Sequence, residues 1–134
     1  MKLLARREHT RAELARKLAQ HGTPEEIEMV LNRLAAAGLQ SDARAAESFL
    51  RARAGRLGKA RLWQSLRSKG VAEDLIEAQL AELPDELERA RAVWTKKFPA
   101  PPGDAKEWAR QARFLLGRGF SSEIIRQLLK EIEA

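Results

Sequence analysis

The sequence predicts an all-α protein of three tandem three-helix repeats, about nine helices in an elongated, curved array. Three observations support this: a helical segment ending in a basic residue or His and then Gly occurs three times, a second helical stripe follows each copy, and no alternating strand pattern occurs. A 33% share of charged residues also favours slim helices with narrow apolar stripes. The three copies are ELARKLAQHG (13–22), LWQSLRSKG (62–70) and QARFLLGRG (111–119).

Another helix is predicted five or six residues after the final glycine of each copy. Its apolar residues follow the i, i+3, i+4, i+7 spacing of one helix face, with one polar substitution at Gln79. Three matches at one spacing indicate a true internal repeat. The stripes are Ile27, Val30, Leu31 and Leu34, then Ile76, Gln79, Leu80 and Leu83, then Ile125, Leu128, Leu129 and Ile132.

The opening helix of each repeat is predicted from a further alignment. AESFLRAR (46–53) aligns with ARAVWTKK (90–97), and KLLARR (2–7) matches the second half of both. Leu3 and Leu4 then align with the apolar pair Phe49–Leu50. The first repeat starts so abruptly that its opening helix is expected to be cut short. Each repeat is too small to bury its own apolar stripes, so stacking of neighbouring repeats is expected to bury them. The predicted repeats are residues 1–38, 39–83 and 84–134.

Local start and stop signals agree with these helices. Thr10 and Thr23 each precede a Glu by three residues, which is the capping-box spacing, and Pro24 occupies a favoured first helical position. Asp104 is predicted to cap a helix in the same way. Residues 98–103, FPAPPG, cannot be helical and are predicted to form a stiff connector. Left-handed glycine caps are predicted at Gly22, Gly38, Gly70 and Gly119.

No combination of residues indicates an enzyme, a metal site or a cofactor. The sequence has no cysteine and lacks the HExxH, GxSxG, Walker-loop and calcium-loop motifs. His21 is expected to complement the dipole of a helix C-terminus, and His9 is expected to be solvated. Trp94 and Trp108 are expected in the core, whereas Trp63 is expected either to pack against the adjoining repeat or to face a partner.

The charge distribution is the strongest functional signal. The chain carries a net charge of +6, which attracts polyanions. From Ser48 to Ala72 there is no Asp or Glu, so helix ion pairs worth about 0.3–0.5 kcal/mol each are missing. Residues 89–103 and 108–122 repeat the pattern more weakly, and stacking is expected to align the cations along one face. The predicted contact residues are Arg7, Arg51, Arg53, Arg56, Lys59, Arg61, Trp63, Arg67, Lys69, Lys96 and Lys97.

Four motifs give the chain a family resemblance. They are R-x-H-[ST]-x-x-E-L at 7–14, D-x-x-x-A-x-x-F at 42–49, G-x-x-R-[IL]-x-x-x-L-x-x-K-G at 58–70 and R-G-F-S at 118–121. Together they resemble the RecX family of recombination regulators over essentially the whole chain. The chain has Lys59 where the family commonly has Pro and Ser65 where it usually has an acidic residue. Both departures make the middle repeat more basic.

The resemblance implies a three-repeat helical protein that binds the RecA recombinase filament on DNA. Members of the family restrain the ATPase, strand-exchange and coprotease activities of RecA, by lying in the filament groove or by blocking filament growth. The implied role is binding, without catalysis, and includes weak backbone contact with single- or double-stranded DNA. No segment approaches the roughly 20 apolar residues of a membrane helix, so we expect a cytoplasmic protein. We also expect a monomer.

Two alternatives are compatible with the same residues. Residues 10–34 contain two predicted helices joined by a short Gly turn, as in helix-turn-helix DNA-binding proteins. Against this alternative, Glu25, Glu26 and Glu28 lie at the leading end of the second helix, where they would oppose phosphate contact. The second alternative is an adaptor that binds an unrelated acidic protein.

Overall fold

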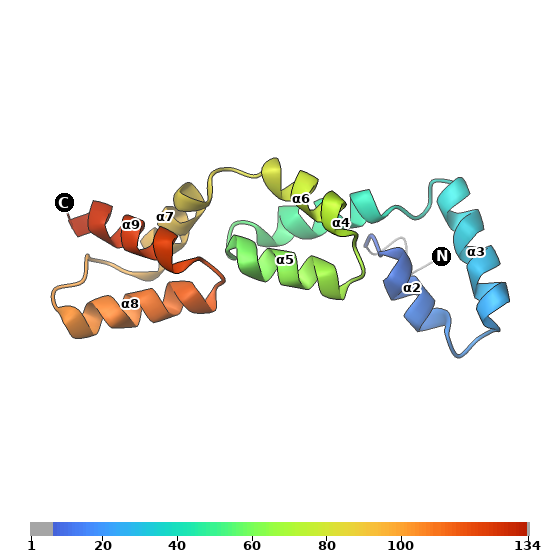
Figure 1. Ribbon diagram of the computed structural model, residues 1–134, viewed down its shortest axis with the longest axis horizontal. Helices are drawn as coiled ribbons and strands as arrows, with labels where there is room; N and C mark the ends of the chain where they lie inside the picture. The colour runs from blue at the N-terminus through green and yellow to red at the C-terminus, as the bar shows by residue number, and fades with distance from the viewer. Residues whose placement is uncertain (1–6, 134) are drawn as a thin grey trace. The chain divides into compact units, whose positions relative to one another are not determined.

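The computed structural model describes residues 7–133, and within this range it contains eight helices and no strand (Figure 1). The all-α prediction and the succession of three-helix repeats are confirmed. The helix expected at 2–7 lies outside the described residues except for Arg7. The repeat boundaries and the curvature of the array stay predictions. The helices are α2 (Arg11–Leu18), α3 (Pro24–Ala36), α4 (Asp42–Arg53), α5 (Lys59–Ser68), α6 (Glu73–Ala81), α7 (Glu86–Lys97), α8 (Ala105–Gly117) and α9 (Ser122–Glu133).

The predicted N-terminal caps are confirmed. The Thr10 hydroxyl accepts a hydrogen bond from the Glu13 N–H at 3.1 Å, and the Glu13 carboxylate accepts one from the Thr10 N–H at 2.9 Å. Thr23 and Glu26 form the same reciprocal pair at the start of α3. Asp104 caps α8 by accepting from the Glu107 N–H at 2.8 Å. The connector at 98–103 is non-helical, as expected.

Three of the four predicted glycine caps are confirmed, and the fourth is wrong. Gly38, Gly70 and Gly119 have positive φ, the conformation in which a side chain is strained. Gly22 does not have positive φ, because α2 ends earlier than the sequence pattern suggests. The helix stops at Leu18, whose carbonyl accepts the His21 N–H at 2.8 Å. Gly22 therefore lies beyond the cap and needs no left-handed conformation.

The chain divides into two compact units. Unit 1 contains the described residues of 1–50 together with 65–79, and unit 2 contains 51–64 together with 80–133. Each of α4, α5 and α6 therefore contributes residues to both units.

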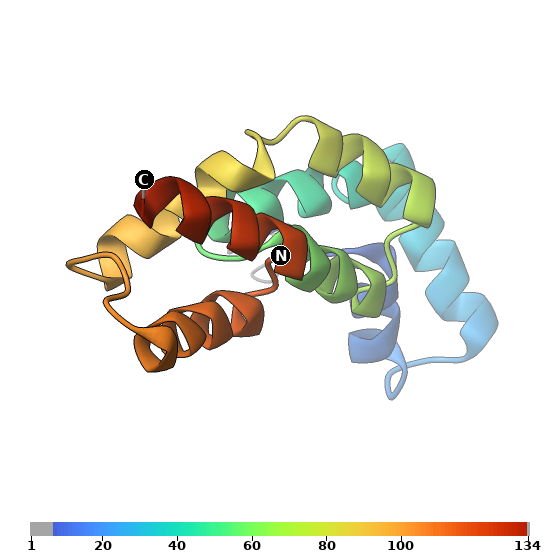
Figure 2. The ribbon, with the colours of Figure 1, turned by 60° about the vertical axis from the view of Figure 1, so that its left-hand side comes forward.

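The core of unit 2 forms where α7, α8 and α9 pack together. α9 lies beside α7 and α8 (Figure 2), and Leu115, Phe120 and Leu128 are buried there. Burying each such side chain contributes about 2 kcal/mol. Trp94 and Trp108 pack against this cluster while partly buried, so their expected core positions are confirmed.

In unit 1 the first turn of α2 docks on the turn that follows α5. The Thr10 hydroxyl donates to the Lys69 carbonyl at 2.6 Å, and the Arg16 guanidinium donates to the Ser68 carbonyl at 3.2 Å. The Arg11 N–H donates to the Asp42 carboxylate at 2.8 Å. This interface corrects the prediction for His9, whose side chain is only 2% exposed. Thr10 is buried where the turn docks, and His9, the preceding residue, is buried together with it.

In unit 2 the first turn of α5 docks in the same way on the turn between α8 and α9. The Gly58 N–H donates to the Arg118 carbonyl at 2.7 Å, and the Arg61 guanidinium donates to the Gly117 carbonyl at 2.6 Å. The Lys59 N–H donates to the Glu86 carboxylate at 2.9 Å, as Arg11 does to Asp42. The two units thus repeat one arrangement, in which helix-start donors meet helix-end carbonyls.

We predict that Gly58→Ala destabilises unit 2, because a Cβ on Gly58 would collide with the backbone of Gly119 and Phe120. Backbone cannot move aside as a flexible side chain does, so the expected loss is about 1–3 kcal/mol of unfolding free energy. Urea denaturation followed by circular dichroism measures it. Gly103→Ala is the control, since a Cβ there meets nothing within 4 Å. Equal stability of the two variants would contradict the close docking of α5.

Candidate anion-binding site

The turn between α4 and α5 is held against α7 by a buried arginine. Arg89 is 8% exposed, and its guanidinium donates to the carbonyls of Leu57 at 2.7 Å, Ala54 at 3.1 Å and Pro84 at 3.3 Å. Burial lowers the pKa of Arg89 from its ordinary value, an effect that the Glu86 and Asp85 carboxylates oppose. Because two of its acceptors flank residues 55 and 56, Arg89 fixes the turn that carries the exposed Arg56.

Two further helices bring cations to the same place. Lys96 and Lys97 follow Val93 on α7 at i+3 and i+4, and Arg118 follows Phe114 at the end of α8 by four residues. The Lys97 amine lies 5.3 Å and the Arg118 guanidinium carbon 5.0 Å from the centre of the Phe114 ring. Such cation–π contacts contribute about 0.5–1 kcal/mol each at exposed sites and orient the two charges.

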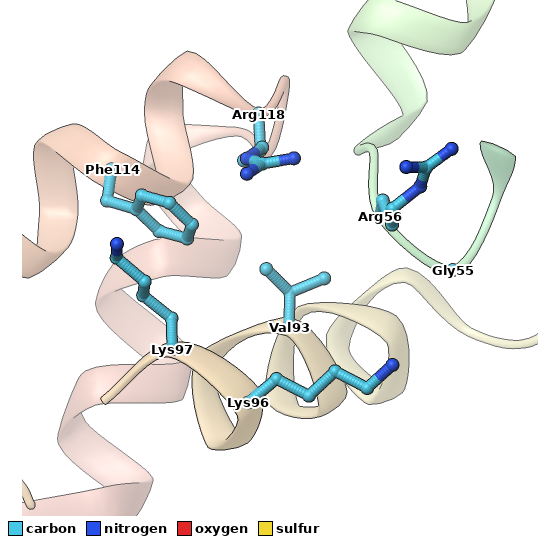
Figure 3. Close-up of a pocket in the computed structure, with 7 residues that line it drawn as sticks. All are labelled: Gly55, Arg56, Val93, Lys96, Lys97, Phe114 and Arg118. Carbon is cyan, nitrogen blue, oxygen red and sulfur yellow. The ribbon is translucent and has the colours of Figure 1, made fainter. Parts of the chain in front are cut away.

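These residues line a hollow of about 220 Å³ in unit 2 (Figure 3). Figure 3 shows Arg118 and Arg56 on opposite sides of the open space, with Val93 between them and Lys96 below; the Arg118 guanidinium points toward the gap, whereas the Arg56 side chain extends away from Arg118. The lining contains four cations and no carboxylate, so the hollow carries uncompensated positive charge. Such a concavity attracts anions. The lining consists of Gly55, Arg56, Val93, Lys96, Lys97, Phe114 and Arg118.

Three predicted residues, Lys59, Arg61 and Trp63, lie on the part of α5 that belongs to unit 2. Lys59 is exposed, with its N–H bonded to Glu86, and the Arg61 guanidinium bonds the Gly117 carbonyl. Trp63 is half-buried and lines a second hollow of about 340 Å³ together with Gly119 and Ser121. Trp63 therefore lies beside residues of the third repeat, while part of its ring is accessible.

In unit 1 the predicted cations lie against carboxylates of the chain itself. Arg7 and Lys69 both bind the Glu13 carboxylate, at 3.1 and 3.3 Å. Arg67 lies 3.6 Å from Glu73. Arg51 and Arg53, at the end of α4, belong to unit 2; they are exposed and make interactions within the chain. Of the predicted residues, the structure therefore brings Arg56, Lys96 and Lys97 together in one hollow.

Sequence reasoning missed Phe114 and Arg118 as parts of this site. Arg118 is the first residue of the R-G-F-S motif, one of the four motifs of the family resemblance, and this is a signal that the turn carries a functional residue. Its proximity to Lys97 follows from the packing of α7 and α8 about Phe114, which no local spacing indicates.

Comparison with known proteins identifies the family. Three family models match the chain: "RecX, first three-helix domain" at residues 1–34, "second three-helix domain" at 41–80 and "third three-helix domain" at 84–129. A protein of Leptothrix cholodnii named Regulatory protein RecX is 54% identical over 97% of this chain and 84% of its own length. The chain belongs to the RecX family.

Other relatives agree with this assignment. Regulatory protein RecX of Pseudomonas entomophila is 47% identical over 96% of this chain and 86% of its own length. The crystal structure of RecX from Lactobacillus salivarius matches the fold with a TM-score of 0.82 at 22% identity, covering 98% of this chain and 90% of that one. Among residues 7–133, none of the helices has the length and apolar character that crossing a bilayer requires.

The lowered pKa of Glu13 makes the unfolding free energy of unit 1 depend on pH. Burial acts to raise its pKa, but the Thr10 N–H, Lys69 and Arg7 together lower it to about 2. Because the folded pKa lies below the ordinary value of 4.5, the carboxylate stabilises the fold above about pH 4.5, and this contribution is lost as the pH falls through about 2.

We therefore predict that Glu13→Gln reduces the unfolding free energy at pH 7 by on the order of 2 kcal/mol. The difference from wild type should narrow between pH 4.5 and pH 2, as measured by urea titrations at a series of pH values. Glu28→Gln serves as an exposed control on α3 and should change stability little at any pH. A Glu13→Gln deficit that stays constant down to pH 2 would contradict this role.

Proposed function

We propose that this chain binds the RecA recombinase filament on DNA and restrains its ATPase, strand-exchange and coprotease activities. Membership of the RecX family supports the proposal, since the relatives reported above carry the name Regulatory protein RecX. On this proposal the chain acts in DNA recombination and repair by binding, without catalysing a reaction. We also propose that it works as a cytoplasmic monomer.

The observation that carries the proposal is the carboxylate-free hollow of unit 2; the exposed Lys59 lines the second hollow of that unit. A nucleoprotein filament presents DNA phosphates and acidic side chains along its length, and cations bind both. The contact on this proposal is made by Arg56, Lys59, Lys96 and Lys97, with Arg118 added to the residues expected from sequence. Arg7, Arg67 and Lys69 face carboxylates of unit 1 and contribute less net charge.

The helix-turn-helix alternative gains no support from α3. Glu25, Glu26 and Glu28 are exposed at its N-terminal end, the end at which a recognition helix contacts bases. Carboxylates there would repel the phosphates on either side of the groove. A footprint on one defined duplex, obtained without recombinase, would favour this alternative over the RecA filament.

We predict that titrating this protein into RecA on single-stranded DNA lowers the rate of ATP hydrolysis in a saturable manner. Because the contact is largely electrostatic, the concentration that halves the rate should rise as salt is added. A coupled ATPase assay measures both effects. An unchanged rate, with no protein retained on RecA filaments in co-sedimentation, would contradict the proposal.

Charge reversal locates the contact. The double variant Arg56→Glu/Lys96→Glu should require about tenfold more protein for the same inhibition, because attraction between these cations and the anionic filament is replaced by repulsion. The double variant Lys17→Glu/Arg33→Glu changes the net charge equally at exposed positions of unit 1 and is the matched control. Equal loss in both variants would show that overall charge, not this surface, governs inhibition.

A further inference from the structure

The hollow of unit 2 differs from the other places where cations gather in the described chain. Arg91 meets Glu131 at 2.7 Å and Arg110 meets Glu107 at 2.8 Å, so these charges are compensated locally. Arg56, Lys96, Lys97 and Arg118 instead share one lining without a carboxylate. Like charges that line one hollow repel one another, and a bound anion would relieve that repulsion.

The turn that carries Arg56 and the side chains of Lys97 and Arg118 are positioned before any ligand binds. Arg89 anchors the turn that carries Arg56 through the carbonyls on either side of it. Lys97 and Arg118 are oriented by the Phe114 ring, and the Arg118 carbonyl is fixed by the Gly58 N–H. A site ordered in this way loses less conformational entropy on binding than mobile surface side chains do.

Size and charge together define the ligand. A hollow of about 220 Å³ is smaller than the roughly 300–1,000 Å³ of typical small-molecule pockets, so it accepts a compact group. A single carboxylate or phosphodiester brings only one negative charge to four cations, whereas an oligophosphate brings several charges in one compact group. The Phe114 ring already contacts two cations, which leaves it poorly placed to stack on a base.

We propose that this hollow binds an oligophosphate anion, the chemistry shared by tripolyphosphate and the phosphate chain of nucleotides. Several charges then lie within one compact ligand, and the two guanidinium groups can bind phosphate oxygens in pairs. The apolar floor of Val93 contributes by excluding water from one side of these contacts. The inference uses residues of the proposed filament surface but does not depend on RecA, which is absent from its test.

The test is isothermal titration calorimetry of sodium tripolyphosphate into the full chain at moderate salt, without divalent cations. We expect saturation near one ligand per chain and binding at least tenfold tighter than that of orthophosphate. The variant Arg56→Ala/Lys96→Ala should weaken binding of tripolyphosphate by about tenfold or more, since it removes charge-assisted hydrogen bonds. Lys97→Ala should weaken it as well.

The control Lys17→Ala/Arg33→Ala removes the same charge from exposed positions of unit 1 and should change the affinity less than about threefold. Equal weakening in both double variants would overturn the proposal, because binding would then be diffuse attraction to a basic protein. The proposal is also overturned if tripolyphosphate binds no better than orthophosphate. The same holds if only oligodeoxythymidine, or only polyglutamate, shows binding that depends on Arg56 and Lys96.

Discussion

The structure depends on one repeated interaction, the docking of a helix start on the glycine turn of the following repeat. In unit 1 the donors are the Thr10 hydroxyl and the Arg11 N–H, and in unit 2 they are the N–H groups of residues 58 to 60. The acceptors are the carbonyls of Lys69, Arg118 and Gly119, together with a carboxylate near the start of the next repeat, Asp42 or Glu86. Groups left unpaired at two helix ends thus satisfy each other, and the partial charges of those ends are complementary.

This interaction explains part of the acid-free segment. α5 begins without an acidic residue in its first turn, yet its first N–H groups are satisfied by Glu86 and by the turn between α8 and α9. Because residues distant in sequence cap the start of α5, the acid-free segment needs no carboxylate of its own at that position. Arg61 is used in the same interface, whereas Arg56 is held by Arg89 beside the hollow. The segment therefore combines structural cations with cations available to a ligand.

Much of the fold could be predicted because its signals are local. Capping boxes at Thr10 and Thr23, and the glycine caps at Gly38, Gly70 and Gly119, depend on residues within one turn. The Gly22 error is also local, because α2 ends at Leu18, but the other errors come from contacts between distant residues. His9 is buried because Thr10 docks on Lys69, 59 residues away, and Arg118 joins the site through packing about Phe114. The pairing of Arg7 and Lys69 with Glu13 likewise could not be read from spacing, so the sequence overstated the free charge of unit 1.

The most direct test of the docking interaction is native-state hydrogen exchange of the backbone N–H groups of Gly58, Lys59 and Ala60, followed by NMR. At an ordinary helix start these groups face water and exchange rapidly. Here they donate to Arg118, Glu86 and Gly119, so the account predicts protection comparable to that of the buried core residues Leu115 and Leu128. Rapid exchange at all three positions, with the core of unit 2 still protected, would contradict it.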